Sequence, residues 1–284
     1  METKKLSVAV LFAAVLFLPA FAFPDEFPII DDSTVIGQNY GYRITGMRQA
    51  GDLDLVVEST FFTKNIEILG DVKGLVVGKT FNGYRAPVRL RYRPHEKLTL
   101  EGGAQLGRNY GDDDSLDATA PIARLAYEPY GDVYLIAGTI LKTHPMHDAL
   151  YDDTLALTQE TEEGIEIRAD LEHFKHDTWL NRKVSETMTR PEQFDIASAS
   201  QFRFGGLRLD GQAIWVHTGG QINNPDDSIA HKVEHNLYFL AGGSYGFDIG
   251  GKLRDVRLGG YYIHGSDSPD VDSGIGDSSG GGVE

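Results

Sequence analysis

The chain has 284 residues, with 42 Asp or Glu against 26 Lys or Arg, so its formal net charge at pH 7 is −16. A chain this acidic is poorly suited to binding the phosphate backbone of nucleic acids. It contains no cysteine, which excludes disulfides and thiolate metal sites.

The first 22 residues have the three parts of a secretory signal peptide. Lys4 and Lys5 give a basic start, an apolar run extends from Leu6 to Leu18, and an Ala-x-Ala ending closes at Ala22. The apolar run is too short to cross about 30 Å of hydrocarbon as a helix. We therefore expect residues 1–22 to be removed on export and residues 23–50 to form an N-terminal periplasmic or plug segment.

From residue 53 to residue 264 the chain is predicted to form amphipathic β-strands. In the clearest case, apolar side chains alternate with arginines in the order Val88-Arg89-Leu90-Arg91-Tyr92-Arg93. Successive side chains of a strand point to opposite faces, so one face of this strand is apolar and the other is charged. Three arginines on one face suit a water-filled lumen or a solvent face better than a packed core.

The alternation predicts eleven strands, separated by connections that are alternately short and long. The long, polar connections are residues 64–85, 108–119, 143–163, 184–192 and 218–235. Short periplasmic turns with long extracellular loops are typical of outer-membrane β-barrels, whereas a soluble sandwich has no reason to sort its loops in this way. The predicted strands are 53–63, 86–93, 97–107, 120–128, 132–142, 163–171, 174–183, 193–203, 206–217, 236–247 and 252–264.

Bacterial single-chain barrels have an even number of strands, so about twelve are expected here. The twelfth is either missing through truncation or lies within residues 30–50, where Asn39–Met47 is the candidate. Residues 265–284, rich in Gly, Ser and Asp, are predicted to be a loop or an incomplete C-terminus. The predicted fold class is all-β, an antiparallel up-and-down transmembrane β-barrel over residues 51–264.

In architecture and alternation, residues 50–264 resemble the porin-like superfamily of Gram-negative outer-membrane β-barrels. The resemblance implies a location in the cell outer membrane, reached by way of a cleavable signal peptide. The expected partners are outer-membrane lipid, lipopolysaccharide and small polar solutes; no cofactor is expected. Because no diagnostic motif accompanies the resemblance, no functional residue follows from it.

Charged side chains on the inward-facing side of the predicted strands are candidates for lining a pore. Both signs are present, which fits either a constriction that selects solutes by charge or a ladder of salt bridges that fills a narrow barrel. The three arginines near residue 90 are expected at the periplasmic mouth. The candidates are Arg89, Arg91, Arg93, Glu101, Arg124, Glu166, Arg168, Asp170, Arg208 and Asp210.

No convincing catalytic or metal-binding pattern is found along the sequence. His144 and His147 lie in the long loop 143–163, which contains no serine, while Ser198 and Ser200 lie mid-strand on the side expected to face lipid. His231 and His235 lack a third ligand, and the acidic stretch at Asp112–Asp114 lacks calcium-loop spacing. We therefore predict that the protein is not an enzyme and that it has no metal site.

The predicted function is that of a porin-like channel through which small polar solutes diffuse along a lumen of mixed charge. Two alternatives remain open. One is a non-conducting barrel whose long acidic loops bind a partner or a surface polymer. The other is a secreted carbohydrate-binding β-sandwich in which Trp179 or Trp215 is a sugar platform.

Overall fold

The computed structural model describes residues 49–67, 78–110, 118–141, 144–147, 149–151, 161–187, 190–219, 233–247, 256–268 and 278–283. All regular elements in these ranges are β-strands. Among the same residues, no helix is long and apolar enough to cross a membrane. The predicted leader and the candidate strand Asn39–Met47 lie outside the described residues.

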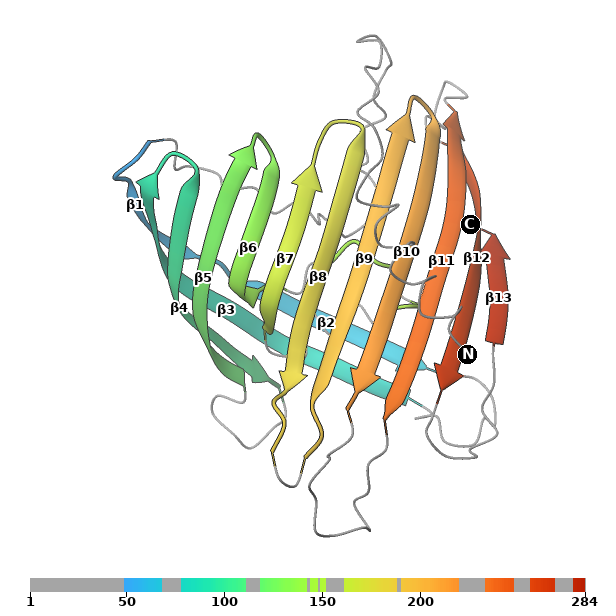
Figure 1. Ribbon diagram of the computed structural model, residues 1–284, viewed down its shortest axis with the longest axis horizontal. Coiled ribbons are helices and arrows are strands. Elements are labelled where there is room, and N and C mark those ends of the chain that lie inside the picture. Colours follow the sequence, from blue (N-terminus) through green and yellow to red (C-terminus); the bar gives the residue numbers. More distant parts are fainter. Residues whose placement is uncertain are drawn as a thin grey trace, which may run out of the picture.

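The strands follow one another along the chain as antiparallel neighbours in a single sheet (Figure 1). They are β1 (Leu53–Val57), β2 (Thr60–Glu67), β3 (Gly78–His95), β4 (Leu98–Asn109), β5 (Ala118–Tyr130), β6 (Val133–Ile140), β7 (Glu162–Asp170), β8 (Phe174–Val184), β9 (Gln193–Phe204), β10 (Leu207–Thr218), β11 (Glu234–Phe247), β12 (Val256–Ser268) and β13 (Ser278–Val283).

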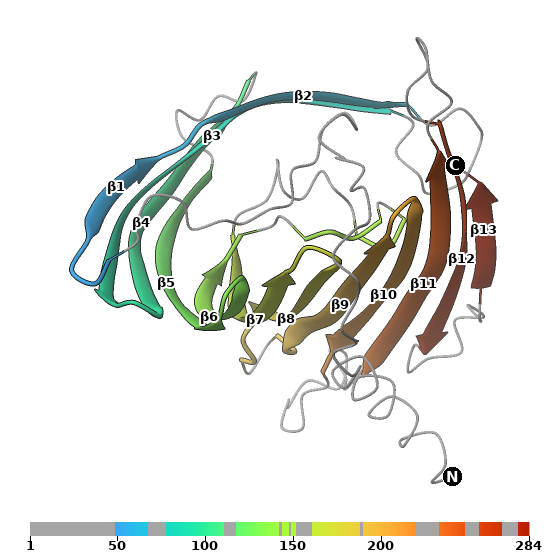
Figure 2. The ribbon, with the colours of Figure 1, turned by 90° about the horizontal axis from the view of Figure 1, so that it is seen from above.

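The order of strands across the sheet is that of an up-and-down barrel with twelve positions. β1 and β2 both pair with β3, β1 at Val88–Tyr92 and β2 at Gly78–Arg85, so together they form one interrupted edge strand. The sheet curls around a common interior, and the β2–β3 hairpin reaches across towards β12 (Figure 2). This confirms the predicted fold class. A β-sandwich, the third reading of the sequence, would need two packed sheets, and the described strands form one.

Two strand assignments made from the sequence need correction. Residues 64–85 were expected to be a long loop, but β2 runs to Glu67 and β3 already begins at Gly78. The twelfth strand is β13, within the segment 265–284 that was expected to be a loop or an incomplete end, and it pairs with Gly260–Gly265 of β12. Its sequence, Ser-Ser-Gly-Gly-Gly-Val, contains too few apolar side chains to show an alternation.

Short and long connections lie at opposite ends of the sheet, as predicted. In Figure 1 the strand ends that lead into the tight turns β5–β6, β7–β8 and β9–β10 are at the upper end, and the ends of β8 and β10 that lead into long connections are at the lower end. Asp132 and Gly205, in two of the turns, have φ angles of 60° and 56°, the left-handed backbone that tight hairpins require.

The alternation of side chains places apolar groups outside and charged groups inside. Leu90 and Ile165 are 55% and 60% exposed on the outer face, whereas Arg89 and Glu166 are 2% and 1% exposed on the inner face. In a barrel that spans a membrane, the outer face contacts lipid and the inner face contacts water or other polar groups. The functional groups of the protein therefore lie mainly inside.

Candidate functional site

The connection after β6 turns back into the barrel and places His144 against β7 and β8. The imidazole Nδ1 lies 2.8 Å from Oδ2 of Asp177, and Nε2 lies 3.0 Å from Oε2 of Glu162. His144 is 3% exposed, and both carboxylates are buried. A histidine held between two acids is a common arrangement for moving a proton.

Two aromatic rings fix the orientation of His144. Its imidazole stacks on the indole of Trp179, and Tyr151 contacts both rings edge-on, with centroids 5.8 Å from each. The Tyr151 hydroxyl also donates a 2.5 Å hydrogen bond to Oε1 of Glu162. His144 therefore has a defined ring plane and a partner on each nitrogen.

A layer of arginines and one further acid lies behind Asp177. Arg168 donates from Nη2 to Oδ2 of Asp177 at 3.1 Å, and its Nε lies 3.1 Å from Oε1 of Glu166. Arg124 approaches Glu166 at 3.9 Å. The site contains three carboxylates and two guanidinium groups. A protonated His144 adds a third positive charge and brings the net charge of the site to zero. We call this group the His144 cluster; it consists of Arg124, His144, Tyr151, Glu162, Glu166, Arg168, Asp177 and Trp179.

The surroundings of His144 favour its protonated form. Burial by itself lowers the pKa of a histidine, but the charges and hydrogen bonds of Asp177 and Glu162 outweigh it and raise the pKa of His144 to about 9. Burial and the neighbouring Glu162 raise the pKa of Tyr151 above its ordinary value. At neutral pH the imidazole is therefore charged and the phenol keeps its proton.

Two groups of side chains could in principle bind a metal ion. Donor atoms of His144, Glu166 and Asp177 lie within 4.8 Å of one another, but Arg168 already contacts both carboxylates, so a cation could bind only if this guanidinium moved away. His235, a metal candidate in the sequence, lies with its Nδ1 3.0 Å from Nδ1 of His217 on the outer face. Its proposed companion His231 and the acidic stretch at 112–114 lie outside the described residues.

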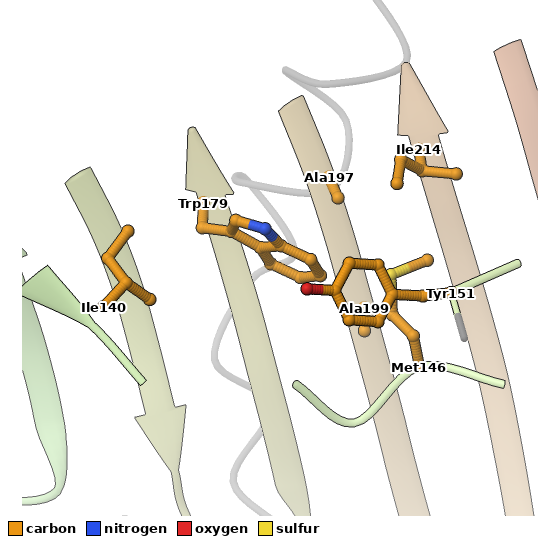
Figure 3. Close-up of a cluster of buried hydrophobic side chains, with 7 residues drawn as sticks. All are labelled: Ile140, Met146, Tyr151, Trp179, Ala197, Ala199 and Ile214. Carbon is orange, nitrogen blue, oxygen red and sulfur yellow. The ribbon is translucent and has the colours of Figure 1, made fainter. Parts of the chain in front are cut away.

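An apolar cluster adjoins the His144 cluster inside the barrel. The side chains of Met146 and Tyr151, from the same connection as His144, lie over Trp179 and the small residues Ala197 and Ala199 (Figure 3). Leu150, Val216 and Tyr238 pack around the edge. The buried members are Ile140, Met146, Tyr151, Trp179, Ala197, Ala199 and Ile214.

The connection that carries His144 crosses the interior of the barrel. The amide of His147 donates to the side-chain oxygen of Gln212 on β10 at 2.7 Å, and the His147 ring lies 4.6 Å from Tyr261 on β12. We call residues 144–147 and 149–151 the crossing segment. It joins the β6 side of the barrel to the β10–β12 side.

At the long-loop end, β6 and β7 stop earlier than the neighbouring strands, and we call this shortened part of the barrel wall the low wall. β6 ends at Ile140 and β7 begins at Glu162, opposite each other, whereas β8 continues to Val184. Figure 1 shows both strands stopping short of β8 and β9 at their lower ends. His144 follows directly after this low wall, so the His144 cluster lies close behind it.

Three of the ten predicted inward side chains belong to the His144 cluster: Arg124, Glu166 and Arg168. Three more form a ladder beside Arg124, the cross-strand neighbour of Glu101, and in this ladder Glu101 contacts Arg91 at 2.7 Å and Arg89 at 3.5 Å. Arg89 also reaches Glu58 on the connection after β1, at 2.8 Å. These acids explain how like-charged arginines can share one face.

The remaining predicted side chains lie towards the short-turn end. Arg93 contacts the backbone oxygen of Glu96 and lies 3.9 Å from Glu128. Asp170 pairs with Lys175 at 3.0 Å, and Arg208 pairs with Asp210 at 2.9 Å. These pairs are partly exposed and are separate from the His144 cluster.

The other members of the cluster were not selected from the sequence, because no short motif connects them. Asp177 and Trp179 both point inward from β8. The alternation of side chains along this strand could have indicated that direction. Trp179 was considered as a sugar platform, but it is 1% exposed and covered by His144, so it offers no open face to a sugar. Ser198 and Ser200 do lie on the outer face, as expected.

On that outer face the two serines meet a histidine. Nδ1 of His176 lies 2.8 Å from Oγ of Ser200, and its Nε2 lies 2.9 Å from Oγ1 of Thr178, which in turn donates to Ser198 at 2.8 Å. His176 comes soon after the turn at 171–173, so this network lies near the short-turn end of the barrel.

Several outer-membrane proteins of known structure are similar to the chain at low sequence identity. OmpT of Vibrio cholerae is 11% identical with a TM-score of 0.44, over 83% of this chain and 82% of that one. A mutant of the Rh. blastica porin is 12% identical with a TM-score of 0.36, over 82% and 94%. Salmonella typhi OmpF, in complex with daunomycin, is 10% identical with a TM-score of 0.38, over 81% and 83%.

No curated protein matches the sequence. A model of the family described as "Lipid A 3'-O-deacylase-type" matches residues 45–281, which include β1 to β12 and most of β13. A deacylase is an enzyme, so the prediction of a protein without enzymatic activity is wrong. Along the sequence, His144 has no convincing Ser/His or Asp/His arrangement in its own loop, because its partners come from β7 and β8. The chain is an outer-membrane β-barrel and belongs to the lipid A 3'-O-deacylase-type family.

Proposed function

We propose that the protein is an outer-membrane hydrolase that removes an ester-linked acyl chain from lipid A. The observation that carries the proposal is the buried His144–Asp177 pair, placed directly behind the low wall in a chain of this family. The low wall faces the long-loop end of the barrel. With the usual orientation, that end lies in the outer leaflet, where lipopolysaccharide is found.

The reaction we propose uses His144 as a general base. Asp177 holds Nδ1–H and stabilises the imidazolium that forms, as the acid does in a catalytic triad. Nε2 is the working atom. In the described arrangement Nε2 faces Glu162 and carries a proton, so the crossing segment must shift and His144 must lose that proton before water can replace the carboxylate.

The bond changes are those of ester hydrolysis. Neutral His144 takes a proton from water through Nε2 while the water oxygen attacks the acyl carbonyl carbon. The tetrahedral intermediate then collapses, the bond between carbonyl carbon and sugar oxygen breaks, and His144 returns the proton to that oxygen. The products are a fatty acid and a free sugar hydroxyl, and no serine is needed.

The intermediate carries a negative oxygen that requires a hydrogen-bond donor. Tyr151 is suitable because its raised pKa keeps the phenol protonated, and its hydroxyl points at the same carboxylate that Nε2 faces. A donor that is already oriented in a buried site stabilises such an oxygen strongly. We assign this role to Tyr151.

The test is acyl release from purified lipid A by the refolded full chain in detergent, followed by mass spectrometry. Wild type is expected to release one fatty acid, and His144→Asn and Asp177→Asn to release almost none. His173→Asn, in the β7–β8 turn, is the matched histidine control and should retain activity. Ser200→Ala separates the interior site from the outer serine–histidine network: loss of activity in that variant alone would refute the assignment to His144.

A diffusion channel is the second candidate function, supported by the charged inner face that includes Arg89 and Arg91. Against it stand the ion pairs of these arginines with Glu101 and the crossing segment that spans the interior. Planar-bilayer recording distinguishes the two functions. A channel requires single-channel steps whose ion preference changes in an Arg89→Gln/Arg91→Gln/Arg93→Gln variant, whereas the hydrolase proposal requires no such steps.

A further inference from the structure

We propose that the apolar cluster of Figure 3 is the binding site for the acyl chain that is cleaved, and that Ala197 and Ala199 limit the chain length it accepts. The inference rests on the proposed function, since it identifies where that substrate binds. The ligand class is a saturated hydrocarbon chain attached through an ester.

The first argument is that this cluster is the larger of the two buried apolar clusters among the described residues and the one that adjoins His144. Charged side chains such as Arg89 and Glu166 lie on the inner face, and Asp195 is inward on β9, but the middle of β9 and β10 carries Ala197, Ala199 and Ile214. A lumen filled with water needs no such patch. Burial of a hydrocarbon stabilises a complex by about 0.8 kcal/mol per methylene, so an apolar patch here favours a ligand with a chain.

The second argument is continuity with the catalytic groups. Trp179 belongs to both clusters: one face of its indole stacks on His144 at 3.5 Å, and the side chain packs among the apolar residues. The register places Trp179 beside Ala197, and Ala197 beside Ile214. Two strand spacings amount to about 10 Å, so a chain whose ester lies at His144 can extend for several methylenes over β9 towards β10.

The third argument is that the crossing segment already fills this site with its own apolar groups. Met146 lies over the two alanines and Leu150 packs against the same cluster, and both are on the segment that carries His144. Methionine is an unbranched, flexible side chain that resembles a short length of acyl chain. The shift that frees Nε2 of His144 therefore also vacates the apolar site, so one movement admits both water and the acyl chain.

The two alanines make the inference testable, because they form the floor of the site. Ala197 is fully buried and Ala199 is 2% exposed, so a larger side chain at either position must project into the space that the acyl chain would take. Loss of contact with each methylene corresponds to roughly a fourfold decrease in kcat/KM. The decrease in kcat/KM should therefore be larger for esters with long acyl chains than for esters with short ones.

The experiment measures kcat/KM of the full-length protein in detergent micelles for short-, medium- and long-chain acyl esters. Ala199→Leu is expected to lower the ratio of kcat/KM for the long ester to kcat/KM for the short ester by about tenfold or more. Ala123→Leu, the same substitution on the exposed outer face of β5, is the matched control and should leave this ratio unchanged. Heat-modifiable gel mobility verifies that each variant is folded.

A binding measurement keeps this inference separate from the proposed function. The chain has two tryptophans, so a Trp215→Phe background leaves Trp179 as the only indole. A brominated fatty acid should quench Trp179 fluorescence there, and Ala199→Leu should weaken the quenching. If Ala199→Leu releases acyl chains with an unchanged preference for chain length, the proposed acyl-chain site is wrong and the proposed hydrolase function still holds. Quenching without hydrolysis would support the site and overturn the function, and absence of quenching would overturn the site.

Discussion

The imidazole of His144 lies flat on the indole of Trp179, with ring centroids 3.5 Å apart and ring planes 3° apart. A protonated imidazole on the face of an indole gains a cation–π attraction in addition to contact. Because Trp179 also belongs to the apolar cluster, this single side chain connects the proton-transfer group with the hydrophobic part of the interior.

Replacing Trp179 by alanine should destabilise the barrel and weaken catalysis. Removal of a fully buried tryptophan typically costs about 3–5 kcal/mol in the free energy of unfolding. The measurement is urea unfolding in detergent, monitored by the gel mobility shift. Trp215→Ala, on the partly exposed outer face, provides the comparison and should cost clearly less; equal losses would contradict the role given to Trp179.

Asp177→Asn should lower kcat by about 10³–10⁴-fold, as loss of the orienting acid does in catalytic triads. The amide cannot stabilise the imidazolium and can hold the wrong tautomer of His144. KM should change little, since Asp177 acts through His144 and is not among the side chains of the apolar cluster. Steady-state kinetics on lipid A measure both constants. A change in KM alone would show that Asp177 contributes to binding rather than to proton transfer.

The pH dependence of activity should rise towards alkaline pH, because the base must be neutral and the pKa of His144 is raised to about 9. Glu162→Gln removes one of the charges that raise it, so the rising limb of kcat/KM should move to lower pH. A pH–rate profile of both proteins gives the answer. An identical limb in the two would mean that His144 is not the titrating group.

The same shift has a consequence for stability. The folded pKa of about 9 exceeds the ordinary value of 6.5, so the stabilisation from protonated His144 is complete below about 6.5 and is lost as pH rises through about 9. Unfolding midpoints in urea should therefore fall over this range in wild type. His144→Asn should remain flat there, since it has no proton to lose at this position.

Glu101→Gln should be among the more destabilising changes in the arginine ladder. It leaves Arg89 and Arg91, both buried, with less negative charge to balance them, and the loss of one partner from a buried ion pair costs about 3–5 kcal/mol. Glu163→Gln, at an exposed position, is the control. Equal unfolding free energies for the two variants would show that the ladder contributes little to stability.

The sequence predicted the strands whose apolar and polar side chains alternate along the chain, and it missed those that lack this alternation. Side chains such as Arg89, Arg124 and Glu166 were placed inside correctly, because alternation is a property of neighbouring residues. β13 was missed because glycine and serine leave no apolar face to read. The first part of β3 was also missed: residues 64–85 were expected to be a loop, but Gly78–Arg85 pair with β2.

The site was harder to predict than the fold, since its residues meet only in three dimensions. His144 was noticed in the long loop 143–163, but nothing local indicates that this part of the chain folds inward or that Asp177, far along the chain, faces it. The same holds for His176 and Ser200, which become neighbours only through the pairing of β8 with β9. Strand alternation gives the direction of each side chain but not its contacts.

The early end of β6 at Ile140 also restricts how the protein can associate within the membrane. If lipid enters beside β6 and β7, this sector of the circumference must remain open to the bilayer. Copies of the chain that assembled through these two strands would obstruct one another's supply of substrate. An active oligomer must therefore use other sectors of the wall for its contacts.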